Sequence, residues 1–233
     1  MKMNKSCISL GQGCQMSLHI SKLLRRKLQT HIFDNMVTNF KTVIEIMKIK
    51  KFKQDDFVNY CLNYNSQNHW KYRCNGENVP LNENWNTSKE LIECKNFPLI
   101  SPHYIDKGKY NTSIITFTDM MNRRLDRFKN ELGKTNFINF FYCANEQFIP
   151  HYIPSIEDIK EFHDLLRFLN PKIQYKVNIL VHPEHHESAK KHKYENERAE
   201  VYLLEYKDKL SQKRIDWPDS NLNWKQTLHR DSQ

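Results

Sequence analysis

Three consecutive stretches decide the fold of this chain: FINFFYC (Phe137–Cys143), SIEDIKEFHDLLRFL (Ser155–Leu169) and YKVNILV (Tyr175–Val181). The first and third are short apolar runs rich in aromatic and β-branched residues, which predicts buried strands. The middle stretch repeats apolar residues at helical spacing, and Ser155 opens it as an N-cap with Asp158 three residues later. A strand, a helix and a strand in this order predict a right-handed crossover between parallel strands.

Further elements are expected on both sides of this unit. The apolar run Cys7–Leu10 predicts a strand, and Lys41–Lys50 has the spacing of an amphipathic surface helix. A second helix is expected to begin at Thr118 as N-cap and to end at Gly133, and a last strand is expected at Glu200–Tyr206. This alternation predicts an α/β fold with a mostly parallel sheet and helices on both faces.

The length of 233 residues fits a single domain, 1–233, and 39% hydrophobic residues are enough for a sizeable core. Within it, residues 63–100 change to an Asn-, Lys- and Trp-containing composition without sustained periodicity, which predicts an irregular or β-hairpin insertion. No stretch has the length of a membrane span or the apolar core of a signal peptide. We therefore expect no membrane partner and a location in the cytoplasm, or in the host cytoplasm if the source is viral.

The charge and the histidines do not favour nucleic-acid or metal partners. The net charge of +9 is spread along the chain, as in a lysine-rich protein from an AT-rich genome, so it does not indicate a phosphate-binding surface. His182, His185, His186 and His192 lie close together in sequence, but no Cys or carboxylate completes a recognised zinc pattern. Hence we expect neither a metal nor a cofactor. The six scattered cysteines predict free thiols in a reducing compartment.

One of these thiols, Cys14, stands where a strand is expected to pass into a helix. Gly11 and Gly13 would turn the chain sharply and leave backbone amides free to hold an oxyanion, and Gln15 is a further candidate substrate-binding residue. The partial positive charge at a helix N-terminus lowers the pKa of a thiol and creates a nucleophile. Two alternatives remain open at this point: Cys14 is a small buried residue, or the Gly11–Cys14 loop belongs to a non-catalytic module that binds an anionic ligand.

Three segments of the chain, in their order, resemble a known domain family. They are Ile8–Gln15, His31–Asn35 and Arg123–Phe128. The family has no established function and is described as a papain-like cysteine peptidase. Its pattern is a strand ending in Ser-Leu-Gly, a Cys three residues later, a Phe-Asp-Trp segment, a stretch with a histidine and a helix with Arg-Arg-x-x-Arg-Phe. Asn35 stands in place of the tryptophan.

The resemblance implies roles for three residues and an alternative fold. Cys14 would be the nucleophile, His103 the base and Asp34 a polar group that orients the imidazole. The implied activity is that of a cysteine-dependent hydrolase or acyltransferase that acts on an amide or ester, in a peptide or another acyl compound. The implied fold is an α+β papain-like one.

The arginines of the third segment have two interpretations. We expect Arg123, Arg124 and Arg127 to lie away from the apolar stripe of their helix, solvated or paired with Asp119 or Glu131. If the helix borders the site, Arg124 or Arg127 would instead bind an anionic group of the substrate.

Overall fold

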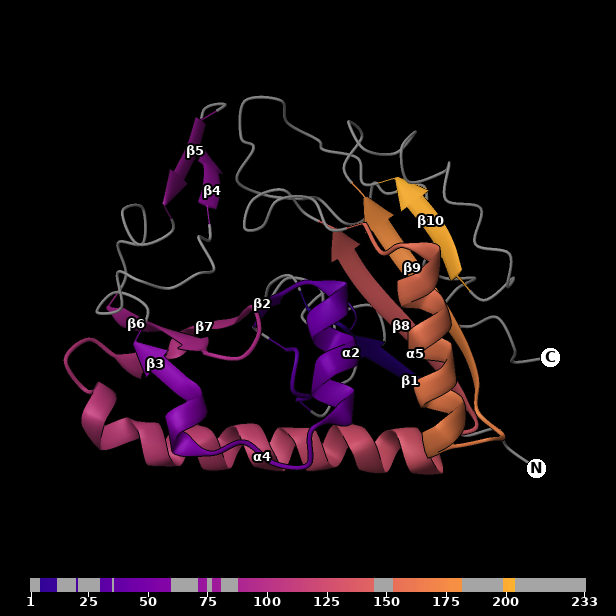
Figure 1. Ribbon diagram of the computed structural model, residues 1–233, viewed down its shortest axis with the longest axis horizontal. Coiled ribbons are helices and arrows are strands. Elements are labelled where there is room, and N and C mark those ends of the chain that lie inside the picture. Colours follow the sequence, from indigo (N-terminus) through magenta and orange to yellow (C-terminus); the bar gives the residue numbers. More distant parts are fainter. Residues whose placement is uncertain are drawn as a thin grey trace.

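The computed structural model describes residues 5–11, 20, 30–34, 36–59, 71–74, 77–80, 88–144, 153–181 and 199–203. Within these ranges the chain forms two four-stranded sheets and a two-stranded one, with a long helix that lies along the lower edge of Figure 1. Cys14 lies outside the described residues, as do its neighbours Gly13 and Gln15. The backbone of His103 is described, but its side chain is not.

The first sheet is parallel, with the strand order β1-β8-β9-β10. Its strands are β1 (Lys5–Ser9), β8 (Phe137–Ala144), β9 (Gln174–Val181) and β10 (Ala199–Leu203). The predicted strands at both ends of the central crossover are therefore confirmed within one residue. The predicted C-terminal strand is confirmed for Glu200–Leu203 and begins one residue earlier, at Ala199.

Helix α5 (Ile156–Leu169) forms the crossover between β8 and β9, and it begins as the sequence predicts. The Ser155 hydroxyl accepts a hydrogen bond from the Asp158 amide, and the Asp158 carboxylate accepts one from the Ser155 amide. The helix buries Phe162 against the sheet, with ring centroids 5.2 Å from Phe140 and 6.2 Å from Tyr175. The capping box and the apolar stripe thus act together to dock α5 on one face of the parallel sheet.

The second sheet is antiparallel, with the strand order β2-β7-β6-β3. Its strands are β2 (Val37–Thr38), β7 (Leu99–Asp106), β6 (Lys89–Cys94) and β3 (Phe57–Asn59), the last preceded by the 3-10 turn η1 (Gln54–Asp56). A separate antiparallel pair consists of β4 (Lys71–Cys74) and β5 (Glu77–Pro80). Residues 63–100, where an irregular or β-hairpin insertion is expected, thus contain the β4–β5 pair and also β6 of the second sheet.

Helix α4 (Tyr110–Lys134) contacts β7 and β3 of the second sheet and also α5 (Figure 1). Its buried apolar side chains follow helical spacing from Phe117 to Leu132. The predicted start at Thr118 is wrong by two turns, because Thr118 lies inside the helix and donates its hydroxyl hydrogen bond to the Ile114 carbonyl. The predicted end is close, since the helix stops one residue after Gly133.

Helix α2 (Phe40–Lys48) confirms the helix expected at Lys41–Lys50, but six of its nine residues are buried. It packs against α5, and Lys48 forms ion pairs of 2.7 Å with Glu161 of α5 and with Glu45. These carboxylates raise the pKa of the Lys48 ammonium. The helix is therefore an internal element that fills the space between the two sheets, and its exposed face is narrow.

The fold class is mixed α/β. The expectation of a mostly parallel sheet is not confirmed, because the described residues form an antiparallel sheet with as many strands as the parallel one. The face of the parallel sheet opposite α5 is also buried at Phe141 and Leu180. Ile20 is helical and buried, but the rest of the helix expected there lies outside the described residues. Among the described helices, none is long and apolar enough to span a membrane.

Candidate functional site

The turn after β1 is built on Gly11. Its φ angle is +104°, a conformation that side chains disfavour, and a Cβ atom there would lie 2.3 Å from the Thr38 Cγ2 atom. The preceding amide, that of Leu10, donates a 2.8 Å hydrogen bond to the Phe141 carbonyl, which continues the pairing of β1 with β8. Where the chain leaves β1, Gly11 therefore lies in close contact with Thr38 of β2, three residues before Cys14.

This turn lies at the edge of the parallel sheet where ligands usually bind in α/β folds. Because β1, β8 and β9 are parallel, their last residues Ser9, Ala144 and Val181 all lie at the carboxyl edge. Ligands gather there because loops and helix N-termini expose backbone amides. The segment that carries Gly13, Cys14 and Gln15 therefore starts from this edge.

Asp34 closes a turn with His31. Its Oδ2 atom accepts a 2.8 Å hydrogen bond from the His31 amide, and its own amide donates to the His31 carbonyl at 3.2 Å. The Asp34 side chain is buried, which strengthens its hydrogen bonds and makes their loss costly. Asp34 thus fixes the path of the chain from the turn to β2, and its predicted effect on His103 remains a prediction.

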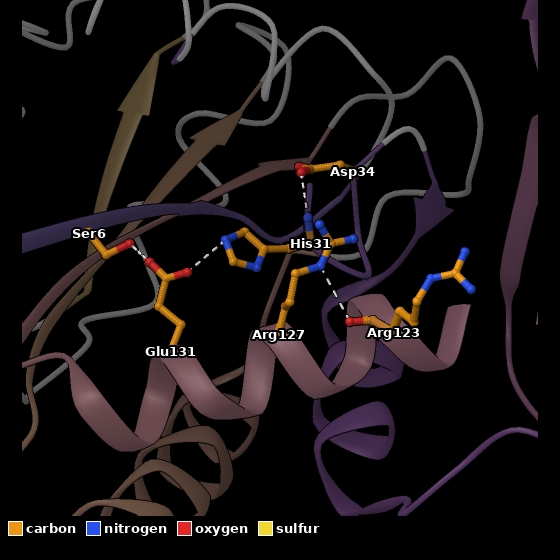
Figure 2. Close-up of polar contacts among 6 residues, drawn as sticks. All are labelled: Ser6, His31, Asp34, Arg123, Arg127 and Glu131. Atoms are coloured by element: carbon orange, nitrogen blue, oxygen red, sulfur yellow. Dashed lines mark hydrogen bonds and ion pairs between the residues drawn. The ribbon is translucent and has the colours of Figure 1, made fainter. Parts of the chain in front are cut away.

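A second network holds the same turn against β1 and α4 (Figure 2). Glu131 of α4 lies between two partners: its Oε1 atom accepts a hydrogen bond from the Ser6 hydroxyl, and its Oε2 atom lies 3.0 Å from His31 Nε2. The His31 ring is buried and makes an edge-type contact with the Phe128 ring, with the two ring centroids 6.4 Å apart. The sequence did not predict this network, because Glu131 was expected to form an ion pair with an arginine. The feature of the sequence that points to it is the position of His31 beside the Phe-Asp motif.

Arg124 is the largest departure from the sequence expectation. It is only 7% exposed, so its predicted place on the solvated face of α4 is wrong. Its Nη1 atom donates to the Tyr104 hydroxyl at 2.7 Å and to the Asp34 carbonyl at 3.4 Å, and the guanidinium carbon lies 4.6 Å from the centre of the Tyr104 ring. Arg124 therefore joins α4 to β7 and to the Asp34 turn.

The other two arginines fit the expectation better. Arg123 is exposed, and Arg127 is partly exposed, with its Nε atom 3.3 Å from the Arg123 carbonyl. Figure 2 shows Arg127 rising from α4 toward the turn that carries His31 and Asp34. Within the described part of the chain, neither Arg123 nor Arg127 forms an ion pair, so the predicted pairing with Asp119 or Glu131 is not found.

Residues 34–38 bring the predicted site positions into one region. Gly11 contacts Thr38 from the side of the parallel sheet, while β2 pairs with β7 from the other side, Val37 opposite Ile100. The backbone of His103 lies three residues further along β7, next to the Tyr104 that binds Arg124. Gly11 and the strand with His103 therefore both border β2, which follows Asp34 closely in the chain.

Three cysteines in the described ranges are buried and form no disulfide: Cys7, Cys94 and Cys143. Burial raises the pKa of Cys94 to about 11 and that of Cys143 further still. At neutral pH both are therefore protonated and unreactive. The expectation of free thiols is confirmed for these three cysteines.

Metal-ligand side chains do not cluster in the part of the chain described, and the four histidines from His182 to His192 lie outside it. A comparison of the chain with models of known families, with curated proteins and with solved structures found no match. The papain-like resemblance therefore stays a prediction, and the function must be argued from the residues.

Proposed function

We propose that this protein is a cysteine-dependent hydrolase or acyltransferase, with the Cys14 thiol as nucleophile and His103 as base, acting on an amide or ester. One observation supports the proposal above the others. Gly11 and the β7 strand with His103, which belong to distant parts of the sequence, both lie against β2, which follows Asp34 closely in the chain. The proposal includes the cytoplasmic location expected from the sequence, since thiols stay reduced there.

The reaction would begin at the carboxyl edge of the parallel sheet. The Cys14 thiol gives its proton to the His103 imidazole, and its sulfur forms a bond to the acyl carbon of the substrate. The carbonyl oxygen becomes an oxyanion, which backbone amides of the Gly11–Cys14 loop would stabilise. When the intermediate collapses, the bond to the amine or alcohol breaks, and the leaving group takes the proton from His103.

A second step would restore the enzyme. Water gives a proton to His103 while its oxygen attacks the thioester carbon. The bond between carbon and sulfur then breaks, which releases the carboxylic acid and the Cys14 thiolate. In an acyltransferase, an acceptor amine or alcohol would take the place of water.

Trapping of the acyl-enzyme tests this proposal. The folded protein is incubated with p-nitrophenyl acetate, quenched in acid and mapped by peptide mass spectrometry. We expect acetyl groups on Cys14 and none on Cys94 or Cys143, because burial keeps those two thiols protonated. A Cys14→Ser protein should release p-nitrophenol at least about a hundredfold more slowly, because an alkoxide is far harder to form than a thiolate.

Two results would remove the proposal. One is acetylation of Cys14 no faster than that of the same cysteine in the unfolded chain, and the other is undiminished turnover by Cys14→Ser. Either result would favour the alternative that the Gly11–Cys14 loop only binds an anionic ligand.

A further inference from the structure

Arg124 is a cation buried between α4 and β7. Only 7% of the Arg124 surface is exposed, yet within the described residues its guanidinium forms no ion pair with a carboxylate. Arg124 does contact Asp34, but it donates its hydrogen bond to the Asp34 backbone carbonyl. The Oδ2 atom of the Asp34 carboxylate instead accepts a hydrogen bond from the His31 amide.

The hydrogen bonds of Arg124 occupy one side of its guanidinium. Nη1 donates to the Tyr104 hydroxyl and to the Asp34 carbonyl, whereas the Nε atom is buried and finds no hydrogen-bond acceptor in the described structure. An arginine stays charged in proteins, and a buried donor without an acceptor costs free energy. The edge formed by Nε and Nη2 is the edge that a carboxylate binds through two parallel hydrogen bonds.

Arg124 also lies beside the proposed reaction site. It contacts the Asp34 carbonyl, and the carbonyl of Met36, two residues later, lies 3.8 Å from the Cβ position at Gly11. Two residues of extended chain span about 7 Å at most. A substrate of ordinary size could therefore reach both the Arg124 guanidinium and the loop that starts at Gly11.

We propose that Arg124 binds a carboxylate of the substrate, so that the protein acts on acyl compounds that carry a free carboxylate near the bond to be cleaved. This inference rests on the proposed function, because it names the substrate class of the same site. One guanidinium balances the single charge of a carboxylate, whereas a phosphate dianion would need a second buried cation, and Arg123 and Arg127 are not buried. The partly exposed Tyr104 covers one face of the guanidinium and leaves the edge formed by Nε and Nη2 to the carboxylate.

Binding without chemistry tests the inference. N-acetylglycine is titrated into the full-length Cys14→Ala protein, and its neutral amide, N-acetylglycinamide, and inorganic phosphate are titrated in parallel. The Nε–H signal of Arg124, assigned by its loss in Arg124→Gln, is followed by ¹⁵N NMR. We expect N-acetylglycine to shift this signal saturably, and the amide and phosphate to leave it in place.

Variants separate binding from folding. Arg124→Gln should weaken N-acetylglycine binding at least about tenfold, because a charge-assisted bidentate contact is lost, while the exposed Arg123→Gln should bind as before. Tyr104→Phe keeps the ring over the guanidinium and removes only the hydroxyl that orients it, so it should weaken binding by a smaller factor. If Arg124→Gln does not fold, Tyr104→Phe still decides the question.

The inference is overturned if the amide binds as tightly as the acid, if phosphate alone moves the Arg124 signal, or if neither Arg124→Gln nor Tyr104→Phe weakens binding. Because the assay uses a protein without the Cys14 thiol, these results are independent of catalysis. Carboxylate binding together with an inert Cys14 would remove the proposed function only, whereas an active Cys14 that ignores the carboxylate would remove this inference only.

Discussion

At the scale of single residues, the sequence indicated the unusual backbone of Gly11 and misplaced Arg124. Two glycines around a strand end indicate a sharp turn whatever the surroundings are, so the special backbone angle of Gly11 could be foreseen. Arg124 follows Met121 by three positions and precedes Phe128 by four, so helical spacing itself places it on the buried face of α4, and the expectation of a solvated side chain misjudged this spacing. What no local pattern reveals is the contact of Arg124 with Tyr104 of β7.

The Gly11 turn gives a prediction with a matched control. Gly11→Ala should lower the free energy of unfolding by about 2–4 kcal/mol, because the new methyl group meets Thr38 and the φ angle is strained. Gly108 also has a positive φ, of 75°, but nothing lies within 4 Å of its Cβ position. Gly108→Ala should therefore cost only about 1–2 kcal/mol.

Urea unfolding followed by circular dichroism measures both variants. The two glycines test the close contact itself, because they share the strained angle and differ in the space around them. Equal losses in the two variants would mean that Thr38 yields easily, and that β1 and β2 are not held together at this turn.

At the scale of elements, helices with a clear stripe and strands with long apolar runs were predictable. The capping box of α5 and the strand β9 were found because the local signals and the tertiary structure agree. The start of α4 was missed because Thr118 satisfies the N-cap pattern, while the packing of Phe117 on Phe57, with centroids 5.1 Å apart, extends the helix further. Strands β2 and β3 have two and three residues, which is too short for any periodicity to show.

One side chain ties α4 to the segment before η1. Asn122 accepts a hydrogen bond from the Phe52 amide at 2.8 Å and donates one to the Phe52 carbonyl at 3.1 Å. Its side-chain amide thus makes the two hydrogen bonds that a neighbouring strand would make to Phe52. Asn122→Ala should lower the free energy of unfolding by about 2–3 kcal/mol, because it leaves two buried backbone groups without partners.

The exposed Asn130 of the same helix supplies the control. Asn130→Ala should change the free energy of unfolding by less than about 0.5 kcal/mol in either direction. Thermal and urea unfolding of both variants decide the matter. A loss in Asn122→Ala no larger than in Asn130→Ala would show that water replaces the Asn122 amide without cost.

At the scale of the whole molecule, the parallel unit could be derived and its partner sheet could not. The order of strand, α5 and strand defines a crossover on its own, whereas the antiparallel sheet pairs Val37 of β2 with Ile100 of β7, far away in sequence. The region that borders residues 34–38 forms only because the two sheets meet there. Cys14 was indicated by its place after a predicted strand and two glycines, Asp34 and His103 came from the family resemblance, and no pattern in the sequence indicates the distances between them.

The reactivity of the thiols tests the central claim most directly. The folded protein is treated with iodoacetamide at a series of pH values, and the rate at Cys14 is followed by peptide mapping. We expect a rate profile with a thiol pKa at least about one unit below the value of about 8.5 for free cysteine, with Cys94 and Cys143 unlabelled. A Cys14 that reacts as free cysteine does, or that does not react before the protein unfolds, would contradict it.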